Sequence, residues 1–193
     1  GPAGLATSIK LKQLNPDLNV CILEKGSEVG AHILSGNVFE TRSLDELIPD
    51  WKNKNAPIKT KVKKEKFLFL GKKSSLSWPT WLLPSVQKNH KNYIISLANL
   101  CRWLANQAED LGVEIFPGFA ASKIIYDHDN KVIGVQTGDM GIGKDKKHKD
   151  NFEPGLNILA KVTVFSEGCR GHLGKELISK YKLDSISLLN SME

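Results

Sequence analysis

Apolar residues recur with two different periods in the first part of the chain, which predict a helix followed by a buried strand. In residues 5–14 they lie one helical turn apart, and the turn around Pro16 ends this helix. Residues 20–23 (Val-Cys-Ile-Leu) form a continuous apolar run that stops at Glu24, which is typical of a buried strand. The chain therefore begins as a unit in which helix and strand alternate.

The strongest helical pattern lies at residues 93–111. Six apolar positions share one face of this helix: Ile94, Leu97, Cys101, Leu104, Ala108 and Leu111. Gly112 stops the helix, and residues 113–115 predict a strand directly after it. We expect this helix to pack against a sheet.

The last third of the chain predicts strands and one more helix. Residues 120–126 and 131–136 alternate like the two strands of a hairpin, joined by a polar turn. A glycine- and lysine-rich stretch at 139–151 predicts an exposed loop. Residues 162–165 then predict a fully buried strand, and residues 173–180 a helix.

The middle of the chain is less regular. Residues 29–40 mix glycines, a histidine and a serine with apolar side chains, which indicates a loop that bends sharply or approaches a flat ligand. Ser43, with Glu46 three residues later, predicts a capped helix start. Residues 67–70 predict a short buried strand. The aromatic, proline-broken stretch 78–84 is either an exposed contact surface or a buried lid.

The first four residues carry the candidate chemistry. Gly1, Pro2, Ala3 and Gly4 resemble the second half of a Gly-x-Gly-x-x-Gly turn, whose first glycine and preceding strand lie upstream. In dinucleotide-binding units such a turn brings the backbone to a pyrophosphate, and an acid about 20 residues later binds the ribose hydroxyls. Glu24 has this spacing. A ligand-free helix start is the alternative, so the prediction of nucleotide binding depends on the order of turn, helix, strand and acid.

Composition narrows the function classes. The 193 residues are 40% hydrophobic, which suffices for a globular core, and no apolar run reaches the roughly 18 residues that span a membrane. Three cysteines, Cys21, Cys101 and Cys169, lie far apart and predict neither a disulfide framework nor a metal site.

The net charge of +6 is local in origin. Between Lys52 and Lys73 there are nine lysines and one acid. This run is either a solvated face or a contact with an anionic membrane or an acidic protein. The chain has no basic motif interleaved with aromatic residues, which argues against a nucleic-acid partner.

One stretch carries a specific family resemblance. Residues 30–36 (GAHILSG), shortly after Glu24, resemble the signature of electron transfer flavoprotein-ubiquinone oxidoreductases. Similar matches continue in register at residues 44–51 (LDELIPDW), 56–58 (API), 112–121 (GVEIFPGFAA), 139–142 (DMGI) and 160–177 (AKVTVFSEGCRGHLGKEL). The resemblance covers nearly the whole chain.

The resemblance implies a membrane-attached flavoenzyme. Its members take electrons from reduced electron transfer flavoprotein, pass them through FAD and a 4Fe-4S cluster, and reduce ubiquinone. The cluster ligands and the ubiquinone segments belong to parts of the family outside the matched region, so this chain alone is expected to be inactive. The implied location is the matrix side of the mitochondrial inner membrane or, alternatively, the bacterial cytoplasmic membrane.

The implied fold is α/β, a Rossmann-like FAD-binding domain of the glutathione-reductase/hydroxylase type. Its first strand is missing, and it carries inserted β-rich and membrane-contact segments. We expect residues 1–28 and 92–180 to form this partial domain, residues 29–91 to be the insert with membrane-contact and lid loops, and residues 181–193 to be a tail. Within the insert, residues 33–51 are expected to dip into the membrane with Trp51 at its edge, and ordinary burial is the alternative.

Flavin carries the electrons itself while the protein binds and orients it, so we expect cofactor contacts rather than catalytic residues or metal ligands. Ala120 and Ala121 are expected at the adenine end, and the Ser35 hydroxyl is expected to stabilise the reduced flavin. The alternative for His32 is an ordinary structural role without contact to a cofactor. The full set of expected FAD contacts is Gly1, Pro2, Ala3, Gly4, Glu24, Lys25, His32, Ser35, Gly36, Ala120, Ala121, Glu167 and Gly168.

Two other interpretations stay open at this point. The chain is either a truncated, catalytically inactive product that at most holds FAD, or part of another FAD-dependent reductase or monooxygenase or of an NAD-dependent oxidoreductase. The last group explains Gly4 and Glu24 but not residues 30–36.

Overall fold

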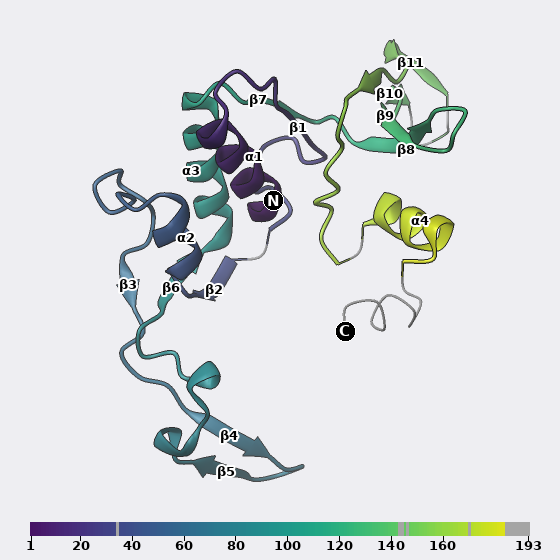
Figure 1. The fold of residues 1–193 in the computed structure, drawn as a ribbon. Coiled ribbons are helices and arrows are strands. Elements are labelled where there is room, and N and C mark those ends of the chain that lie inside the picture. The colour runs from purple at the N-terminus through teal and green to yellow at the C-terminus, as the bar shows by residue number, and fades with distance from the viewer. Residues whose placement is uncertain (34, 143–144, 146, 170, 184–193) are drawn as a thin grey trace.

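A computed structural model describes residues 1–33, 35–142, 145, 147–169 and 171–183. Two helices, α1 (Pro2–Leu14) and α3 (Leu97–Asp110), lie side by side (Figure 1). Strands β1 (Cys21–Glu24) and β7 (Glu114–Pro117) pair in parallel beside them, from Cys21 opposite Glu114 to Glu24 opposite Pro117. The mixed α/β composition is as predicted from the sequence.

A second small sheet continues from this layer. Its order is β2 (Ser35–Phe39), β6 (Tyr93–Ser96) and β3 (Thr60–Lys61), all antiparallel. The prediction that a helix starts at residue 93 is wrong, because residues 93–96 pair with β2 instead. Ser96 is the N-cap of α3, and its Oγ accepts a hydrogen bond from Asn99 N at 3.4 Å.

The main hydrophobic core fills the space between α1, α3 and the short helix α2 (Arg42–Leu47). Leu44, Ile48 and Trp51 belong to this core, and Trp51 is only 3% exposed. Its indole Nε1 donates to Asp45 Oδ1 at 2.7 Å, and this bond, with a second from Thr41, lowers the pKa of Asp45 below its usual value. These residues therefore do not form the expected membrane edge.

The start of α2 also differs from the prediction. Thr41 is the N-cap and Ser43 lies inside the helix, so Ser43 does not begin a capping box. The Thr41 hydroxyl instead donates to Asp45 Oδ2 at 2.9 Å. A Ser and a Glu three residues apart are common in helices, and only the backbone conformation distinguishes the capping position.

An arm, residues 62–92, projects away from the core (Figure 1). It consists of the hairpin β4 (Phe67–Leu70) and β5 (Ser75–Trp78), followed by the 3₁₀ turns η1 (Thr80–Leu82) and η2 (Ser85–Gln87). Residues 67–70 form the predicted strand but are not buried, since Leu70 is 79% exposed. Within the described residues, no helix is long and apolar enough to cross a membrane.

The C-terminal part forms a three-stranded antiparallel sheet covered by a helix. The order is β12 (Asn157–Leu159), β9 (Val132–Thr137) and β8 (Ala121–Tyr126), with α4 (His172–Tyr181) packed on β8. Ile124, Val135 and Leu173 form its core. The predicted hairpin is confirmed. Residues 139–151 are not only a loop, because β10 (Met140–Ile142) pairs with β11 (His148–Glu153).

The fully buried strand predicted at residues 162–165 is absent. No strand is assigned to these described residues, and Val162 is 79% exposed. An apolar run becomes a strand only when a neighbouring strand supplies its hydrogen bonds, and no described strand pairs with this run. The segment nevertheless passes α1, since a Cβ placed on Gly4 would lie 3.3 Å from Ser166 Cβ. The predicted tail lies outside the described residues from position 184 onward.

Glu167 caps α4 from outside the helix. Its Oε2 accepts a hydrogen bond from Gly174 N at 2.7 Å, and its Oε1 lies 3.6 Å from His172 Nδ1. The N-cap, Gly171, has no side chain to make such a bond. Any side chain at Gly171 would collide with Glu167. The carboxylate thus also meets the positive end of the helix dipole.

We expect Leu5→Ala to lower the free energy of unfolding by about 2–5 kcal/mol, because the side chain is 1% exposed in the main core. The matched control is Leu14→Ala in the same helix, where the side chain is 72% exposed and the loss should stay below about 0.5 kcal/mol. Urea denaturation measures both. Equal losses would contradict the assignment of this helix face to the core.

A second test concerns the α4 cap. Glu167→Ala should lower the free energy of unfolding by about 0.5–2 kcal/mol, the usual cost of a lost cap, and Glu167→Gln should cost less because it retains an oxygen acceptor. Glu109→Ala, at an exposed position on α3, is the control. An unchanged unfolding curve for Glu167→Ala would contradict the capping role.

Candidate functional site

The candidate site lies where β1 and β7 end together. Because the two strands are parallel and Glu24 is opposite Pro117, the residues after both strands meet at one edge of the sheet. Helix α1 begins at the same edge, since the Gly1 nitrogen lies 3.7 Å from Glu24 Oε2. The fold therefore brings together the glycine turn and the acid that the sequence predicts as partners.

The Glu24 side chain is held in place by the backbone of the following turn. Its Oε1 accepts a hydrogen bond from Gly26 N at 2.8 Å, and the side chain is 18% exposed. The carbonyl of Gly26 in turn accepts from Gly118 N at 2.7 Å, which ties the turn after β1 to the turn after β7. Gly26 has no room for a side chain, because a Cβ there would lie 2.9 Å from Glu28 O.

The N-terminus of α1 has no side-chain cap. Its N-cap is Gly1, no acidic residue occupies the first turn, and Pro2 has no N–H group. The amides of Ala3 and Gly4 belong to the first turn, where α-helical N–H groups have no carbonyl partner within the helix. An uncapped helix start of this kind favours an anion.

Ala120 and Ala121 follow this edge along the chain. They are half-buried at the start of β8, two and three residues after Gly118. The carbonyl of Ala120 accepts from Gly138 N at 2.9 Å, and Ala121 pairs with Thr137. Backbone pairing within the sheet thus holds both alanines in place, shortly after the Gly118 turn in the chain.

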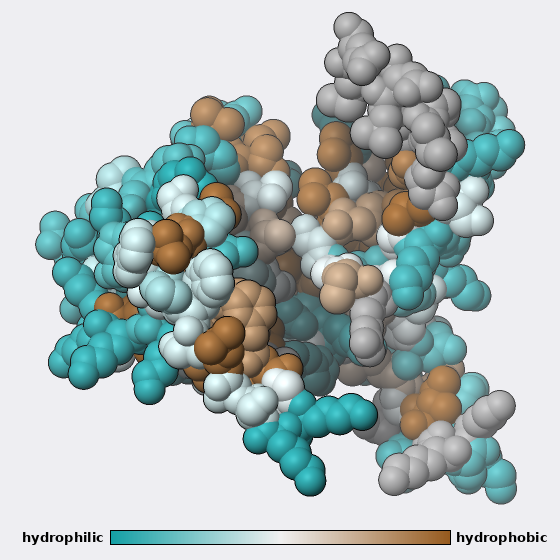
Figure 2. Space-filling view, turned by 90° about the horizontal axis from the view of Figure 1, so that it is seen from below, coloured by the Kyte–Doolittle hydropathy of each residue, from teal (hydrophilic) through white to brown (hydrophobic). Residues whose placement is uncertain are grey.

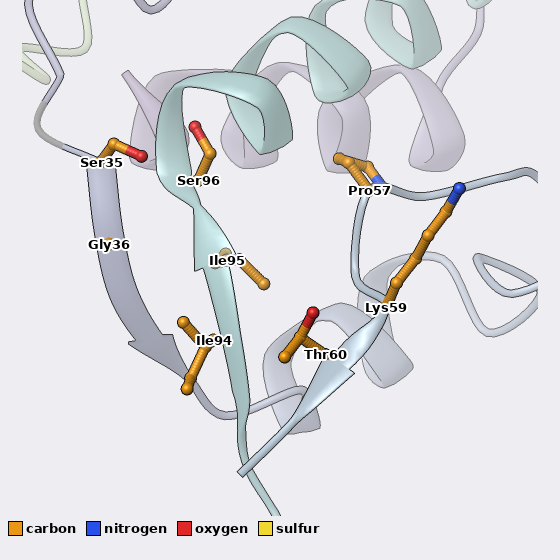
Figure 3. Close-up of a pocket in the computed structure, with 8 residues that line it drawn as sticks. All are labelled: Ser35, Gly36, Pro57, Lys59, Thr60, Ile94, Ile95 and Ser96. Atoms are coloured by element: carbon orange, nitrogen blue, oxygen red, sulfur yellow. The ribbon is translucent and has the colours of Figure 1, made fainter.

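Ser35 and Gly36 lie in a different place, beside a recess of about 490 Å³ (Figure 3). Ser35 is the first residue of β2 and is directly opposite Ser96 on β6. Gly36 has φ of +82° with open space around it, so its backbone conformation, not crowding, favours glycine there. The recess is lined by Ser35, Gly36, Pro57, Lys59, Thr60, Ile94, Ile95 and Ser96.

The sequence patterns do not single out four of these lining residues: Lys59, Thr60, Ile95 and Ser96. Ile95 and Ser96 lie within the predicted helix at residues 93–111, and Lys59 and Thr60 lie within the lysine-rich run. What brings them together is the β2-β6-β3 pairing, in which β6 meets β2 and β3 from 54–61 and 32–34 residues away in the sequence, so no local pattern announces it. Non-local pairing of this kind is what the sequence alone does not reveal.

The other residues predicted to contact FAD do not gather at one place in the fold. His32 and Lys25 are exposed. Glu167 and Gly168 are exposed near the start of α4, where the Glu167 carboxylate is bonded to the helix. Gly168 has φ of +73°. The structure therefore gives Glu167 a partner within the chain at the position where the sequence suggested a cofactor contact.

Burial affects the thiol pKa of two of the three cysteines. Cys101 is fully buried on α3, and burial raises its pKa. Burial, together with the nearby Glu114 carboxylate, also raises the pKa of Cys21. Among the described residues no group of three or more His, Cys, Asp or Glu side chains is placed to hold a metal ion.

Two solved structures resemble this fold. THI4 of Thermovibrio ammonificans aligns with a TM-score of 0.55 over 93% of this chain and 59% of its own, at 16% identity. A geranylgeranyl bacteriochlorophyll reductase-like protein of Thermoplasma acidophilum aligns with a TM-score of 0.52 over 82% of this chain and 34% of its own, at 20% identity. At these identities the likeness concerns the fold alone. No family model matches the chain.

Sequence relatives are much closer. A probable electron transfer flavoprotein-ubiquinone oxidoreductase of Acinetobacter baylyi is 54% identical over 95% of this chain and 33% of its own length. The mitochondrial proteins of that name from Arabidopsis thaliana and Mus musculus are 53% and 47% identical over 95% of this chain, and over 29% and 30% of their own lengths. The chain thus spans about a third of the relatives' length, and as such a segment it belongs to the electron transfer flavoprotein-ubiquinone oxidoreductase family.

Proposed function

We propose that this chain is the part of an electron transfer flavoprotein-ubiquinone oxidoreductase that binds FAD. The observation that carries the proposal is the position of the Glu24 carboxylate, whose Oε2 lies 3.7 Å from the Gly1 nitrogen at the start of α1. A diphosphate and a ribose are adjacent in FAD. A helix start and an acid this close together suit those two groups.

The donor set suits the cofactor. The first turn of α1, Gly1, Pro2, Ala3 and Gly4, offers backbone amides without a side-chain cap, and glycine at both ends lets a diphosphate approach closely. One oxygen of Glu24 is taken by Gly26 N, which orients the carboxylate and leaves the other oxygen able to accept ribose hydroxyls. Lys25 beside it and the backbone at Ala120 and Ala121 extend the proposed contacts towards the adenine.

FAD, once bound, accepts and donates electrons at its ring. We assign the ring to the side of the molecule that carries His32, Ser35 and Gly36. There Ser35 is exposed beside the recess and opposite Ser96, so its hydroxyl is available to donate a hydrogen bond to the ring. Such a donor would favour the reduced, anionic ring over the oxidised one. Gly36, which has a left-handed backbone conformation within β2, adds no side chain beside Ser35.

In the whole protein the proposed electron path starts at reduced electron transfer flavoprotein and ends at ubiquinone. It passes through FAD and a 4Fe-4S cluster, whose ligands are not in this chain. The names of the eukaryotic relatives support a mitochondrial location, and the relative from Acinetobacter supports a bacterial alternative. The proposed division remains a partial Rossmann-like FAD-binding domain at residues 1–28 and 92–180 with an insert at residues 29–91.

The insert also contains the segment that we propose contacts the membrane. Within residues 33–51 the Trp51 side chain is buried in the core, but the arm exposes apolar side chains that a soluble surface seldom carries together. Trp81 is 74% exposed, Val86 91% and Leu70 79%. We therefore propose that the arm attaches the protein to the membrane surface. An interfacial hairpin needs no spanning helix, because its apolar face enters only the outer part of the acyl layer.

We expect Glu24→Gln to weaken FAD binding by about ten- to one hundred-fold, because a hydrogen bond to a charged group contributes about 1.5–3 kcal/mol. Quenching of flavin fluorescence during titration of the full-length apoprotein measures the affinity. Glu114→Gln is the matched control, since Glu114 lies at the opposite end of the same strand pair. Unchanged affinity in Glu24→Gln, or an equal loss in the control, would count against the proposed site.

A second experiment tests the arm. The double variant Leu76→Ser with Trp81→Ser, at positions 65% and 74% exposed, should lower partitioning into neutral phosphatidylcholine vesicles by about tenfold or more, because each large apolar side chain contributes about 1.5–3 kcal/mol when buried. Co-sedimentation of the full-length protein measures the partitioning. Leu14→Ser removes a leucine of similar exposure, 72% against 65% for Leu76, outside the arm and should have no effect. If the double variant behaves like this control, the arm is not the membrane contact.

A further inference from the structure

Positive charge is concentrated on the arm and its approach. Residues 52–91 contain eleven lysines and one acid, a formal charge of +10 against +6 for the whole chain, so the rest of the chain is acidic on balance. The single acid, Glu65, is turned inward, and its carboxylate accepts a hydrogen bond from Asn89 N at 2.9 Å. The arm thus presents lysines to the outside without a compensating acid.

Six exposed lysines of the arm form what we call the lysine collar: Lys63, Lys64, Lys66, Lys72, Lys73 and Lys91. Of the carboxylates in the described part of the chain, none lies within ion-pair distance of these six. Lys63, Lys64 and Lys66 immediately precede β4, whereas Lys72 and Lys73 lie in the turn between β4 and β5. The collar therefore flanks the hairpin at both of its ends.

Between these ends the hairpin has one aromatic face. In the β4–β5 register Phe67 is opposite Trp78 and Phe69 is opposite Leu76, so these four side chains share a face. Phe69 contacts Phe67 and Trp78 edge to face, with ring centroids 5.3 and 5.8 Å apart. The other face alternates Leu68 and Leu70 with Ser75 and Ser77. The hairpin is thus amphipathic, with the larger apolar groups on one side.

The base of the arm is hydrogen-bonded across its two legs. Val62 N donates to Asn92 O at 2.9 Å, and Glu65 joins the legs through Asn89 N. Lys88 Nζ donates to Trp81 O at 3.1 Å and so ties η1 to the returning leg. This places Lys63, Lys64 and Lys66 beside the leg that carries Lys91. The view onto the hairpin end of the molecule shows hydrophobic and hydrophilic residues interspersed on this side (Figure 2).

We infer that the lysine collar binds anionic phospholipid headgroups, so that the arm selects an anionic bilayer and does not merely partition into any lipid. This inference rests on the proposed membrane contact of the arm. With the aromatic face lying in the interface, lysines at both ends of the hairpin are at headgroup level, where their long side chains reach the phosphates. Negative lipid surfaces attract such clusters strongly.

The apolar face argues for a bilayer over an acidic protein surface as the occupant. An acidic protein would neutralise the collar but would leave Trp78, Trp81 and Val86 without apolar partners unless it also had a matching apolar groove. A bilayer with anionic lipids supplies both the negative charge and the apolar layer in one surface. Tryptophan and lysine side by side are typical of membrane interfaces.

The test compares two kinds of vesicle. The full-length protein is mixed with vesicles of phosphatidylcholine alone and with vesicles in which about a third of the lipid is phosphatidylglycerol. We expect the anionic vesicles to bind about ten- to one hundred-fold more tightly, and this preference to fall as salt rises and the charges are screened. Binding to the neutral vesicles should change little with salt.

The decisive variant is Lys63→Gln with Lys64→Gln and Lys66→Gln. It should lose most of the preference for anionic vesicles and keep the wild-type affinity for neutral ones. The control, Lys10→Gln with Lys123→Gln and Lys161→Gln, removes the same charge from exposed positions outside the arm and should keep the preference. Loss of preference in this control too would mean that overall charge, not the collar, acts, and it would overturn the inference.

Other outcomes distinguish the lysine collar as a lipid site from the proposed membrane contact of the arm. Equal binding of the wild-type protein to both vesicles overturns the lysine collar as a lipid site but leaves the apolar contact intact. Binding to neither overturns both. A triple variant that keeps its vesicle preference but binds electron transfer flavoprotein more weakly assigns the collar to a protein partner and overturns the lipid inference.

Discussion

The parallel pairing of β1 with β7 is the constraint on which the candidate site depends. The two strands lie about ninety positions apart in the chain, and their register brings Glu24 level with Pro117. The Gly26–Gly118 hydrogen bond then closes the edge behind them. Without that register, Glu24 would not face the start of α1, and Ala120 would not follow at the same edge. Helix α3, which leads into β7 and packs on α1, makes the pairing possible.

Much of the fold around this site was predictable from the sequence, because local patterns define its helices and strands. The helices at α1 and α4, the strands β1 and β7, and the β8–β9 hairpin all have a period or a turn that residues close in sequence determine. The position of Glu24 beside the start of α1 was predictable from the 20-residue spacing between Gly4 and Glu24. The family resemblance was carried by residues 30–36, which local physics by itself interprets only as a bending loop.

The predictions of structure and burial that were wrong share a different cause. Residues 93–96 extend the apolar pattern of α3, yet they are a strand because β2 and β3 lie on either side of them. Phe67 to Leu70 and Val162 to Phe165 are both apolar runs, which indicate what a segment prefers but not whether another segment covers it. Trp51 was misassigned for the same reason, since a partner for its indole, Asp45, lies on the preceding helix and completes its burial. Burial is a property of the whole fold and is only weakly encoded at the residue itself.

The four tryptophans of the chain are divided between these two environments. Trp51 is buried, and Trp103 is half-buried with its indole bonded to the Lys54 carbonyl at 2.8 Å. Trp78 and Trp81 are on the arm and exposed. We therefore expect the intrinsic fluorescence of this chain to contain two components: a blue-shifted one from the interior that reports folding, and a red-shifted, readily quenched one that reports the surroundings of the arm. The molecule carries its own optical probe at the surface where it is proposed to meet its partner.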